Sequence, residues 1–134
     1  MEKKIKHLEL IQITINRFST NSFQIKGWSI LIVSALFALA ASDANPYFAF
    51  LAYVPSVVFW GLDGYYLSME RLYRKLYEIV RKTEDDDIDF SMNTKGLNEK
   101  KHPWVCATLS KTLIPFHCSI LIAIIIVMFS LIQK

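Results

Sequence analysis

Apolar residues fall into three long blocks along the chain, and the segments between the blocks are amphipathic or charged. The first block, 27–41, has no charged residue, but about 15 residues of helix reach only about 22 Å, whereas the hydrocarbon core of a bilayer is about 30 Å thick. We therefore expect the first membrane span to cover 23–42, with Lys26 reaching the headgroups from inside the helix end. The blocks at 47–67 and 112–132 are each long enough to form a further span.

Turn-forming residues separate the first two blocks. The stretch 42–46 includes Asn45 and Pro46, and a helix does not continue readily through the residue before a proline. This stretch therefore predicts a tight hairpin between the first two spans. Pro55 lies near the middle of the second block and predicts a kink in that span.

Amphipathic segments flank the first two spans. After Leu67, apolar residues recur at steps of three and four over 68–83, so we expect the second span to continue as a helix beyond the membrane. The same spacing over 1–22 predicts an amphipathic helix that either rests in the membrane interface or packs on 68–83. The polar stretch 84–104 is expected to be an exposed loop. Its acidic run lacks the spaced ligands and the glycine of a calcium loop, which favours a linker over a divalent-ion site.

These elements predict an all-α integral membrane protein with a single domain over 1–134. The chain is 53% apolar, and its 15 Lys+Arg and 12 Asp+Glu give a net charge of +3. Because these charges are spread among the segments, the dense basic surface of a nucleic-acid-binding protein is missing, and we expect no direct nucleic acid binding. On one helix, Cys106 and Cys118 would lie roughly 18 Å apart, too far for a disulfide.

Lysine and arginine residues are distributed asymmetrically around the spans. By the positive-inside rule, 1–22 and 68–104 lie in the cytoplasm, and the hairpin turn and the C-terminus lie outside. The cations are Lys3, Lys4, Lys6, Arg17 and Lys26 before the first span and Arg71, Arg74, Lys75, Arg81, Lys82, Lys95, Lys100 and Lys101 between the second and the third. Alternatively, Ala38-Leu39-Ala40 is a signal-peptidase site, but the segment before it is longer and more amphipathic than the start of a signal peptide.

The densest group of chemically distinctive side chains lies where the second span is expected to leave the membrane. Glu70 precedes Arg74 by four residues, the favourable order for an ion pair on one helix. A carboxylate at the membrane boundary is costly without a cation, so we expect Asp63 to meet Arg71 or Arg74 of a neighbouring helix. Asp63, Glu70, Arg71 and Arg74 would then form a polar collar that joins subunits or lines a vestibule; the alternative is a solvated charged face. The aromatic residues that fit an interfacial belt are Trp60, Tyr65 and Tyr66.

Small residues recur along both spans of the hairpin. Small side chains let helix backbones approach closely, and we expect these to pack the hairpin against itself, with packing between subunits as the alternative. They are Ser34, Ala38 and Ser42 on the first span and Ala49, Ala52 and Ser56 on the second.

The third span carries one ionisable residue, His117, near its start. We expect its ring to bond to a neighbouring carbonyl or hydroxyl, because further metal ligands are missing from the nearby sequence. The sequence has no phosphate-binding loop, no paired nucleophile and base and no glycine-rich fingerprint, so it predicts neither an enzyme nor a bound cofactor or metal.

Several short stretches near the start of the first span and the end of the second span resemble those of a known protein family. They are Asn16-Arg17, Asn21-Ser22-Phe23, Lys26-Gly27-Trp28, Phe59-Trp60-Gly61-Leu62-Asp63, Tyr66-Leu67 and Glu70-Arg71-Leu72-Tyr73-Arg74. With them, the chain resembles the RipA-type family of small octameric bacterial inner-membrane proteins over 16–77, and the third span lies outside this resemblance. The resemblance implies a ring-like oligomer in the bacterial inner membrane. A wider likeness is to small multi-span effectors of anti-phage systems, whose assembly damages or depolarises the host membrane when a cytosolic partner signals infection.

We therefore expect a non-enzymatic, homo-oligomeric inner-membrane effector that perturbs or gates membrane permeability in anti-phage defence of the abortive-infection type. Its expected partners are the lipid bilayer, further copies of the chain and a cytosolic defence or signalling protein. One chain has too few spans to enclose a pore, so conduction would require an oligomer. The alternative is a membrane anchor that recruits a cytosolic enzyme, and a third possibility is a small transporter subunit based on Asp63 and His117.

Overall fold

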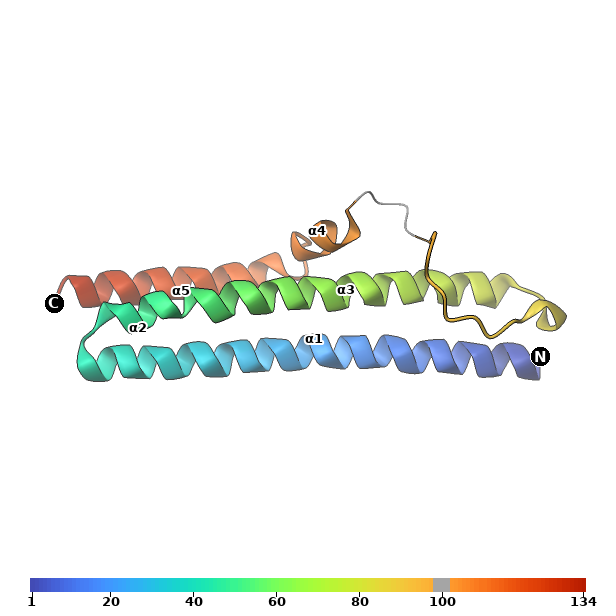
Figure 1. Ribbon diagram of the computed structural model, residues 1–134, viewed down its shortest axis with the longest axis horizontal. Coiled ribbons are helices and arrows are strands. Elements are labelled where there is room, and N and C mark those ends of the chain that lie inside the picture. Colours follow the sequence, from blue (N-terminus) through green and yellow to red (C-terminus); the bar gives the residue numbers. More distant parts are fainter. Residues whose placement is uncertain (98–101) are drawn as a thin grey trace.

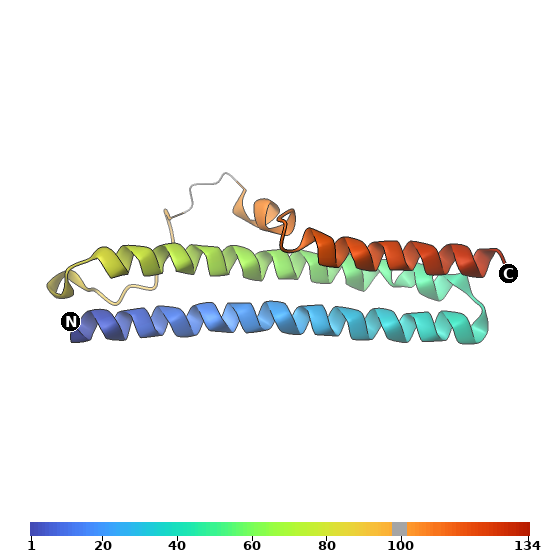
Figure 2. The same cartoon turned by 180° about the vertical axis from the view of Figure 1, so that it is seen from behind.

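The computed structural model describes residues 1–97 and 102–134, and within these ranges every regular element is a helix (Figure 1). The long helices are α1 (Glu2–Asp43), α3 (Tyr53–Lys82) and α5 (Ile114–Ile132). Helix α3 runs antiparallel to both α1 and α5, and the same arrangement is visible from behind (Figure 2). The predicted all-α fold is confirmed, and the described residues include three helical segments that are long and apolar enough to cross a membrane.

Helix α1 joins two elements that the sequence predicted separately, the amphipathic helix over 1–22 and the span over 23–42. Nothing in the sequence between these segments breaks a helix, because the nearest glycine, Gly27, costs only about 1 kcal/mol relative to alanine. At about 1.5 Å per residue, the 42 residues of α1 extend about 63 Å. The amphipathic segment is therefore a rigid continuation of the apolar one.

The predicted hairpin turn is built by Ala44 and Asn45. Ala44 adopts a left-handed conformation (φ 49°) that ends α1, and its N–H donates to the carbonyl of Ala40. The side chain of Asn45 then accepts a hydrogen bond from the N–H of Tyr47 and caps α2 (Pro46–Leu51). Pro46 stands at the start of α2, where its missing N–H costs nothing.

The second apolar block is divided at Ala52, whereas the sequence predicted a kink at Pro55 itself. Pro55 has no N–H to offer the carbonyl of Leu51, so the interruption falls one turn before the proline, between α2 and α3. From Tyr53 onwards α3 continues without a break through the predicted extension over 68–83. Helix α3 thus connects two ends of the molecule. The end with the hairpin turn at 44–46 is called the apolar end below, and the end with 1–22 and 68–97 is called the polar end.

At the polar end, the N-terminal part of α1 packs on the C-terminal part of α3. Ile11 and Ile15 of α1 and Leu76 and Val80 of α3 form a buried core there. Of the two placements left open for 1–22, the structure has the packed one. The reason is that the apolar residues of α1 and those of α3 lie at similar distances from the hairpin turn, so they meet when the two helices pack side by side.

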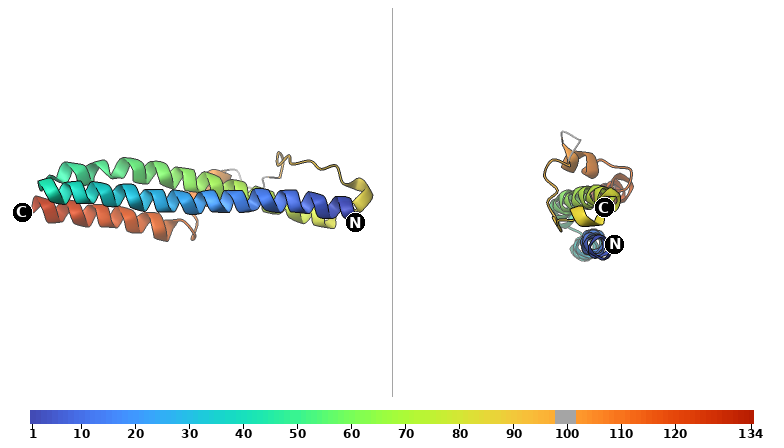
Figure 3. Two further views of the ribbon diagram at one scale, coloured as in Figure 1. Left: turned by 90° about the horizontal axis from the view of Figure 1, so that it is seen from below. Right: turned by 90° about the vertical axis from the view of Figure 1, so that its right-hand side faces the viewer.

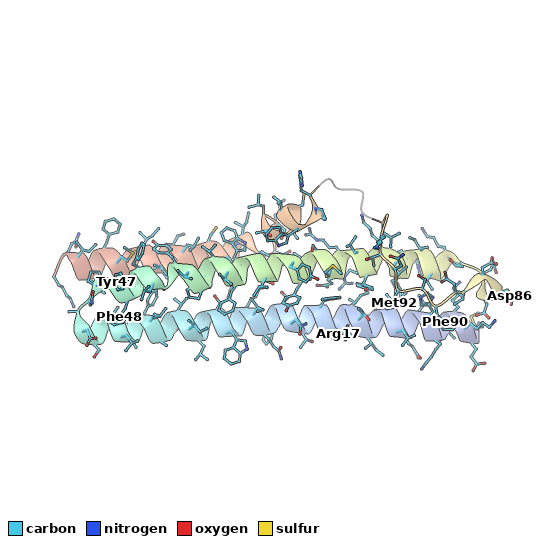
Figure 4. The ribbon with its side chains drawn as sticks, in the orientation of Figure 1. Arg17, Tyr47, Phe48, Asp86, Phe90 and Met92 are labelled. Carbon is cyan, nitrogen blue, oxygen red and sulfur yellow. The ribbon has the colours of Figure 1, made fainter. Side chains whose placement is uncertain are left out.

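The segment that follows α3 folds back along this core. It begins with a short 3-10 helix, η1 (Asp85–Asp87), and Phe90 and Met92 lie beside the N-terminal part of α1 (Figure 4). The buried ring of His7 forms a hydrogen bond of 2.9 Å with the carbonyl of Ser91. Asp85 accepts hydrogen bonds from the ammonium of Met1 and the backbone N–H of Lys4, which lower the pKa of its carboxyl.

The stretch predicted as a loop over 84–104 therefore contains helical turns. Besides η1, the short helix α4 (Pro103–Thr108) begins before the predicted loop ends. Lys100 and Lys101, two of the cations that set the predicted orientation, lie outside the described residues. Helix α5 starts at Ile114 with Pro115 in its first turn, two residues later than the predicted start of the span.

The apolar end has a second core between the hairpin and α5. Val33 of α1, Ala52 before α3 and Ile124 of α5 are buried in it, and Phe37 and Met128 pack around them. Seen from below, α1 and α5 both run along the α2–α3 segment (Figure 3). The side chains that point away from this core are mostly apolar as well.

We expect the polar-end core to contribute substantially to stability. Substituting Ile11→Ala, at a side chain that is 0% exposed, should lower the free energy of unfolding by about 2–5 kcal/mol because it leaves a cavity. Ile13→Ala removes the same atoms from a side chain that is 65% exposed and should change stability by less than about 0.5 kcal/mol. Thermal unfolding in detergent measures both. Equal effects would mean that 1–22 does not pack on α3.

Candidate functional site

A buried ionic cluster joins the three long helices. Asp63 of α3 is 0% exposed, and around it stand Ser22 and Lys26, one turn apart on α1, and His117, in the first turns of α5. The ammonium of Lys26 lies 2.6 Å from one carboxylate oxygen of Asp63, and the Nε2 atom of His117 lies 2.8 Å from the same oxygen. The hydroxyl of Ser22 donates to the other oxygen.

Each polar group around the Asp63 carboxylate has a definite role. An ionised carboxylate only accepts hydrogen bonds, so the Nε2 atom of His117 carries its proton and donates it. Lys26 also donates to the hydroxyl of Ser22 at 3.0 Å, which leaves the Ser22 proton for Asp63. The negative charge of Asp63 is paired within the chain with the positive charge of Lys26.

Aromatic side chains cover the cluster. The indole of Trp60 is stacked on the ring of His117, with 5.7 Å between centroids and an interplanar angle of 8°. Phe116 meets His117 edge-on at 5.0 Å, and the ammonium of Lys26 lies 5.8 Å from the centroid of the Phe116 ring. The carboxylate of Asp63 is 0% exposed among these groups, whereas the side chain of Lys26 is 23% exposed, so the loss of the cation beside the carboxylate is costly.

The chemistry available to the cluster is charge compensation, because the ammonium of Lys26 faces the carboxylate of Asp63 and the imidazole of His117 donates a hydrogen bond to it. Over the described part of the chain, no group of three His, Cys, Asp or Glu residues is arranged to hold a metal ion. The sequence expected a carbonyl or hydroxyl partner for His117, and that expectation is wrong because the acceptor is the carboxylate of Asp63.

The predicted polar collar is divided in the structure. Arg74 pairs with Glu70 of its own helix at 2.7 Å, and the side chain of Arg74 is 61% exposed. Within the chain, the cation beside Asp63 is Lys26, so the expected pairing of Asp63 with Arg71 or Arg74 is replaced by one with α1. Arg71 and Arg74 lie on α3 at least two helical turns beyond Asp63, so their side chains do not reach its carboxylate.

The predicted aromatic belt is also divided. The indole N–H of Trp60 donates to the carbonyl of Thr108 at 2.9 Å, so Trp60 fastens α4 to α3. Tyr66 packs against Phe18 of α1, with 6.3 Å between ring centroids. Tyr65 is 48% exposed and is the member of this group with the most outward position.

The two stripes of small residues face different surroundings. Ala49, Ala52 and Ser56 are buried, where small side chains allow α2 and the start of α3 to lie close to their neighbours. The residues of the first stripe are all exposed, so they do not pack the hairpin; these are Ser34, Ala38 and Ser42. For the first stripe, the alternative of packing between subunits remains as a prediction.

Helix α4 approaches α3 closely on a different face from the ionic cluster. The indole N–H of Trp104 on α4 donates to the carbonyl of Gly61 on α3 at 2.9 Å. In the opposite direction, the indole N–H of Trp60 on α3 donates to the carbonyl of Thr108. A Cβ atom added at Gly64 would lie 3.1 Å from the Cα atom of Thr108 and 2.1 Å from its hydroxyl. Only glycine therefore allows this contact between backbones.

The sequence did not identify Ser22, Lys26, Gly64 or Trp104 as parts of the site. Ser22 and Lys26 share a helical face with a polar character that is unusual at the end of an apolar block, which is a detectable signal. The sequence contains no comparable indication that α4 exists or that it seats on Gly61 and Gly64.

We expect the ion pair in the cluster to be energetically coupled. Lys26→Met alone leaves the fully buried charge of Asp63 without its cation and should cost about 3–5 kcal/mol. Asp63→Asn should cost less, because the Lys26 side chain is 23% exposed, and the double variant should cost clearly less than the sum of the two. Thermal unfolding in detergent measures this cycle. The matched control is Glu70→Gln with Arg74→Met, a surface pair worth at most about 1 kcal/mol. Strict additivity at Asp63 and Lys26 would show that the pair is not formed.

Gly64→Ala should displace α4 from α3, because the new methyl group overlaps the Thr108 backbone and hydroxyl. Hydrogen exchange of the amides in 104–110 should become at least about tenfold faster, since the opening free energy falls by 1.4 kcal/mol or more. Gly27→Ala is the control, because a Cβ there meets nothing within 4 Å. Unchanged exchange in Gly64→Ala would exclude the close contact.

Comparison with known proteins finds no matching family model, no matching curated protein and no matching solved structure. The likeness to the RipA-type proteins therefore stays a prediction that rests on the residues named for it.

Proposed function

We propose that this is a three-span membrane protein that self-associates and thereby changes the permeability of the bilayer. The support for insertion is the small buried share of the most apolar stretches. In the most apolar 18-residue windows of α1, of the α2–α3 segment and of α5, only 17%, 28% and 11% of the residues are buried. A water-soluble domain would have to cover such surfaces, whereas lipid tails solvate them.

The position of the ionic cluster fits the thickness of a bilayer. Both Lys26 and Asp63 lie about 18 residues from the hairpin turn at Asn45, a distance of about 27 Å along a helix. A hydrocarbon core of about 30 Å that begins at the turn therefore ends just beyond the cluster. In this proposal the cluster seals the three spans together at one membrane boundary, where ionisable groups face the interior of the bundle.

The polar end of the molecule would then project from the cytoplasmic side. The N-terminal part of α1, the C-terminal part of α3 and the segment over 83–97 lie together there, and they carry most of the lysine and arginine residues. The positive-inside rule favours this orientation, with the hairpin turn and Lys134 on the other side of a bacterial inner membrane.

Self-association is supported by the observation that carries the proposal, the unpacked small-residue face of α1. Ser34, Ala38 and Ser42 are exposed, and Gly27, which lies on the same face, has open space where its side chain would be. Lipid gains little from contact with small residues, whereas another helix gains close packing. Three spans are too few to enclose a pore, so a permeability change would come from several copies acting together.

A second candidate function is that of a membrane anchor for a cytosolic partner, without a permeability change. It is favoured by the polar end, because α1 and α3 continue there with a core of their own and form a surface that the spans do not need. Assembly without leakage would distinguish this anchor from the proposed effector.

We expect Ala38→Leu to weaken assembly at least about tenfold, which corresponds to about 1.4 kcal/mol, because the larger side chain separates the packed faces. Light scattering of the purified protein in detergent measures the oligomer mass, and release of a small dye from liposomes measures permeability. Wild-type protein should form an oligomer and release the dye, and Ala38→Leu should reduce both.

The control for this experiment is Val57→Phe, which adds comparable bulk at an exposed position of α3 outside the small-residue face. This variant should behave like wild type. A monomeric wild-type protein would overturn the proposal, and an oligomer that releases no dye at any protein-to-lipid ratio would favour the anchor.

A further inference from the structure

The short helix α4 carries exposed apolar side chains at an unusual place. Trp104 is 51% exposed, Val105 47% and Leu109 58%, and Cys106 between them is exposed as well. Helix α4 lies on the side of α3 that faces away from α1, outside the bundle of long helices (Figure 1, Figure 3). Among the described residues, nothing in the chain covers this face.

Hydrogen bonds and a close backbone contact hold α4 at a defined position along the length of α3. The reciprocal indole hydrogen bonds, from Trp104 to the Gly61 carbonyl and from Trp60 to the Thr108 carbonyl, join it to α3 at two points. Gly61 and Gly64 flank Asp63 in the sequence, so α4 is seated at the height of the ionic cluster. Its apolar face therefore does not move freely along the molecule.

We propose that α4 is a membrane-interface foot, whose exposed face binds the boundary between headgroups and acyl chains of the same leaflet that surrounds the cluster. This inference rests on the proposed insertion of the long helices, because it places α4 at the end of the hydrocarbon core. The bound partner is the lipid surface itself. The foot is defined by Trp104, Val105, Cys106 and Leu109.

Two observations favour lipid over a protein partner. Leu62 and Tyr65, which directly follow the contact residues Gly61 and Gly64 on α3, are exposed as well, so the outward surface of α3 is also apolar at the level where α4 is attached. The exposed residues at its two ends, His102 and Lys111, are polar or cationic and fit the phosphate groups of the headgroup layer. The indole N–H of Trp104 is already hydrogen-bonded to the carbonyl of Gly61, so the ring enters this layer without leaving an unpaired hydrogen-bond donor.

The test uses Cys106 as a native labelling site. In the full chain with Cys118→Ala, a nitroxide attached to Cys106 reports its collision rates with oxygen, which is enriched in lipid, and with a water-soluble nickel chelate. Reference labels are placed at Ile126→Cys, an exposed residue of α5, and at Asp86→Cys at the polar end, each in the Cys106→Ala and Cys118→Ala background. The protein is reconstituted in vesicles of phosphatidylethanolamine and phosphatidylglycerol.

The expected ratio of oxygen to nickel collisions at Cys106 lies between those of the two references, as for a group at the lipid boundary. A ratio equal to that of the Asp86→Cys label would overturn the inference, because α4 would then lie in water. Protection from both reagents would also overturn it, since a second copy or another protein would cover the face. If the Ile126→Cys label itself behaves as in water, the proposed insertion fails instead, so the two failures are distinguishable.

A variant with a displaced foot provides the matched comparison. Gly64→Ala in the same labelled background should shift the Cys106 ratio towards the aqueous reference, because the methyl group forces α4 away from α3. Val54→Ala, at a 63% exposed position of α3 ten residues before Gly64, should leave the ratio unchanged. An unchanged ratio in both variants would show that seating on α3 does not determine the depth of the foot.

Discussion

The structure depends on the burial of one carboxylate. Asp63 is completely covered, and a buried charge is tolerated only where a cation and hydrogen-bond donors surround it. Those groups come from two other helices, with Ser22 and Lys26 on α1 and His117 on α5. Because each helix must place a particular residue at the same height, the cluster fixes the register of all three. Apolar packing alone would tolerate sliding by a turn, since one aliphatic side chain substitutes readily for another.

The two apolar cores on either side of the cluster have different tasks. The core at the polar end, around Ile11 and Leu76, unites segments that carry many charges and would otherwise be solvated. The core at the apolar end, around Val33 and Ile124, is small because most apolar side chains of the long helices point outward. The ionic cluster therefore adds specificity where apolar contact is limited, and it leaves the outward apolar faces uncovered.

Hydropathy and turn chemistry predicted the overall fold well. The three apolar blocks, the hairpin at Asn45 and the extension of the second span correspond to helices or turns in the structure, because length, proline positions and caps act locally. The cluster was predicted only in part. The sequence showed that Asp63 requires a cation, but periodicity assigns a residue to a face and does not identify its partner on another helix. An arginine was therefore expected where Lys26 stands, and the seat of α4 gave no signal, since it depends on the missing side chain of Gly64.

The same cluster bears on the proposed insertion of the long helices into a membrane. If they cross a bilayer as proposed, Lys26 and Asp63 would enter lipid separately only at a large cost, whereas together they form a neutral, hydrogen-bonded pair. On that proposal the hairpin would close before, or as, the spans are buried, and α5 would join when His117 reaches the carboxylate. Ser34, Ala38 and Ser42 are exposed and take no part in the cluster. The residues that hold the three helices together are thus separate from those proposed for association, so substitutions at Asp63 are expected to affect the fold of one chain and substitutions at Ala38 the proposed contact between copies.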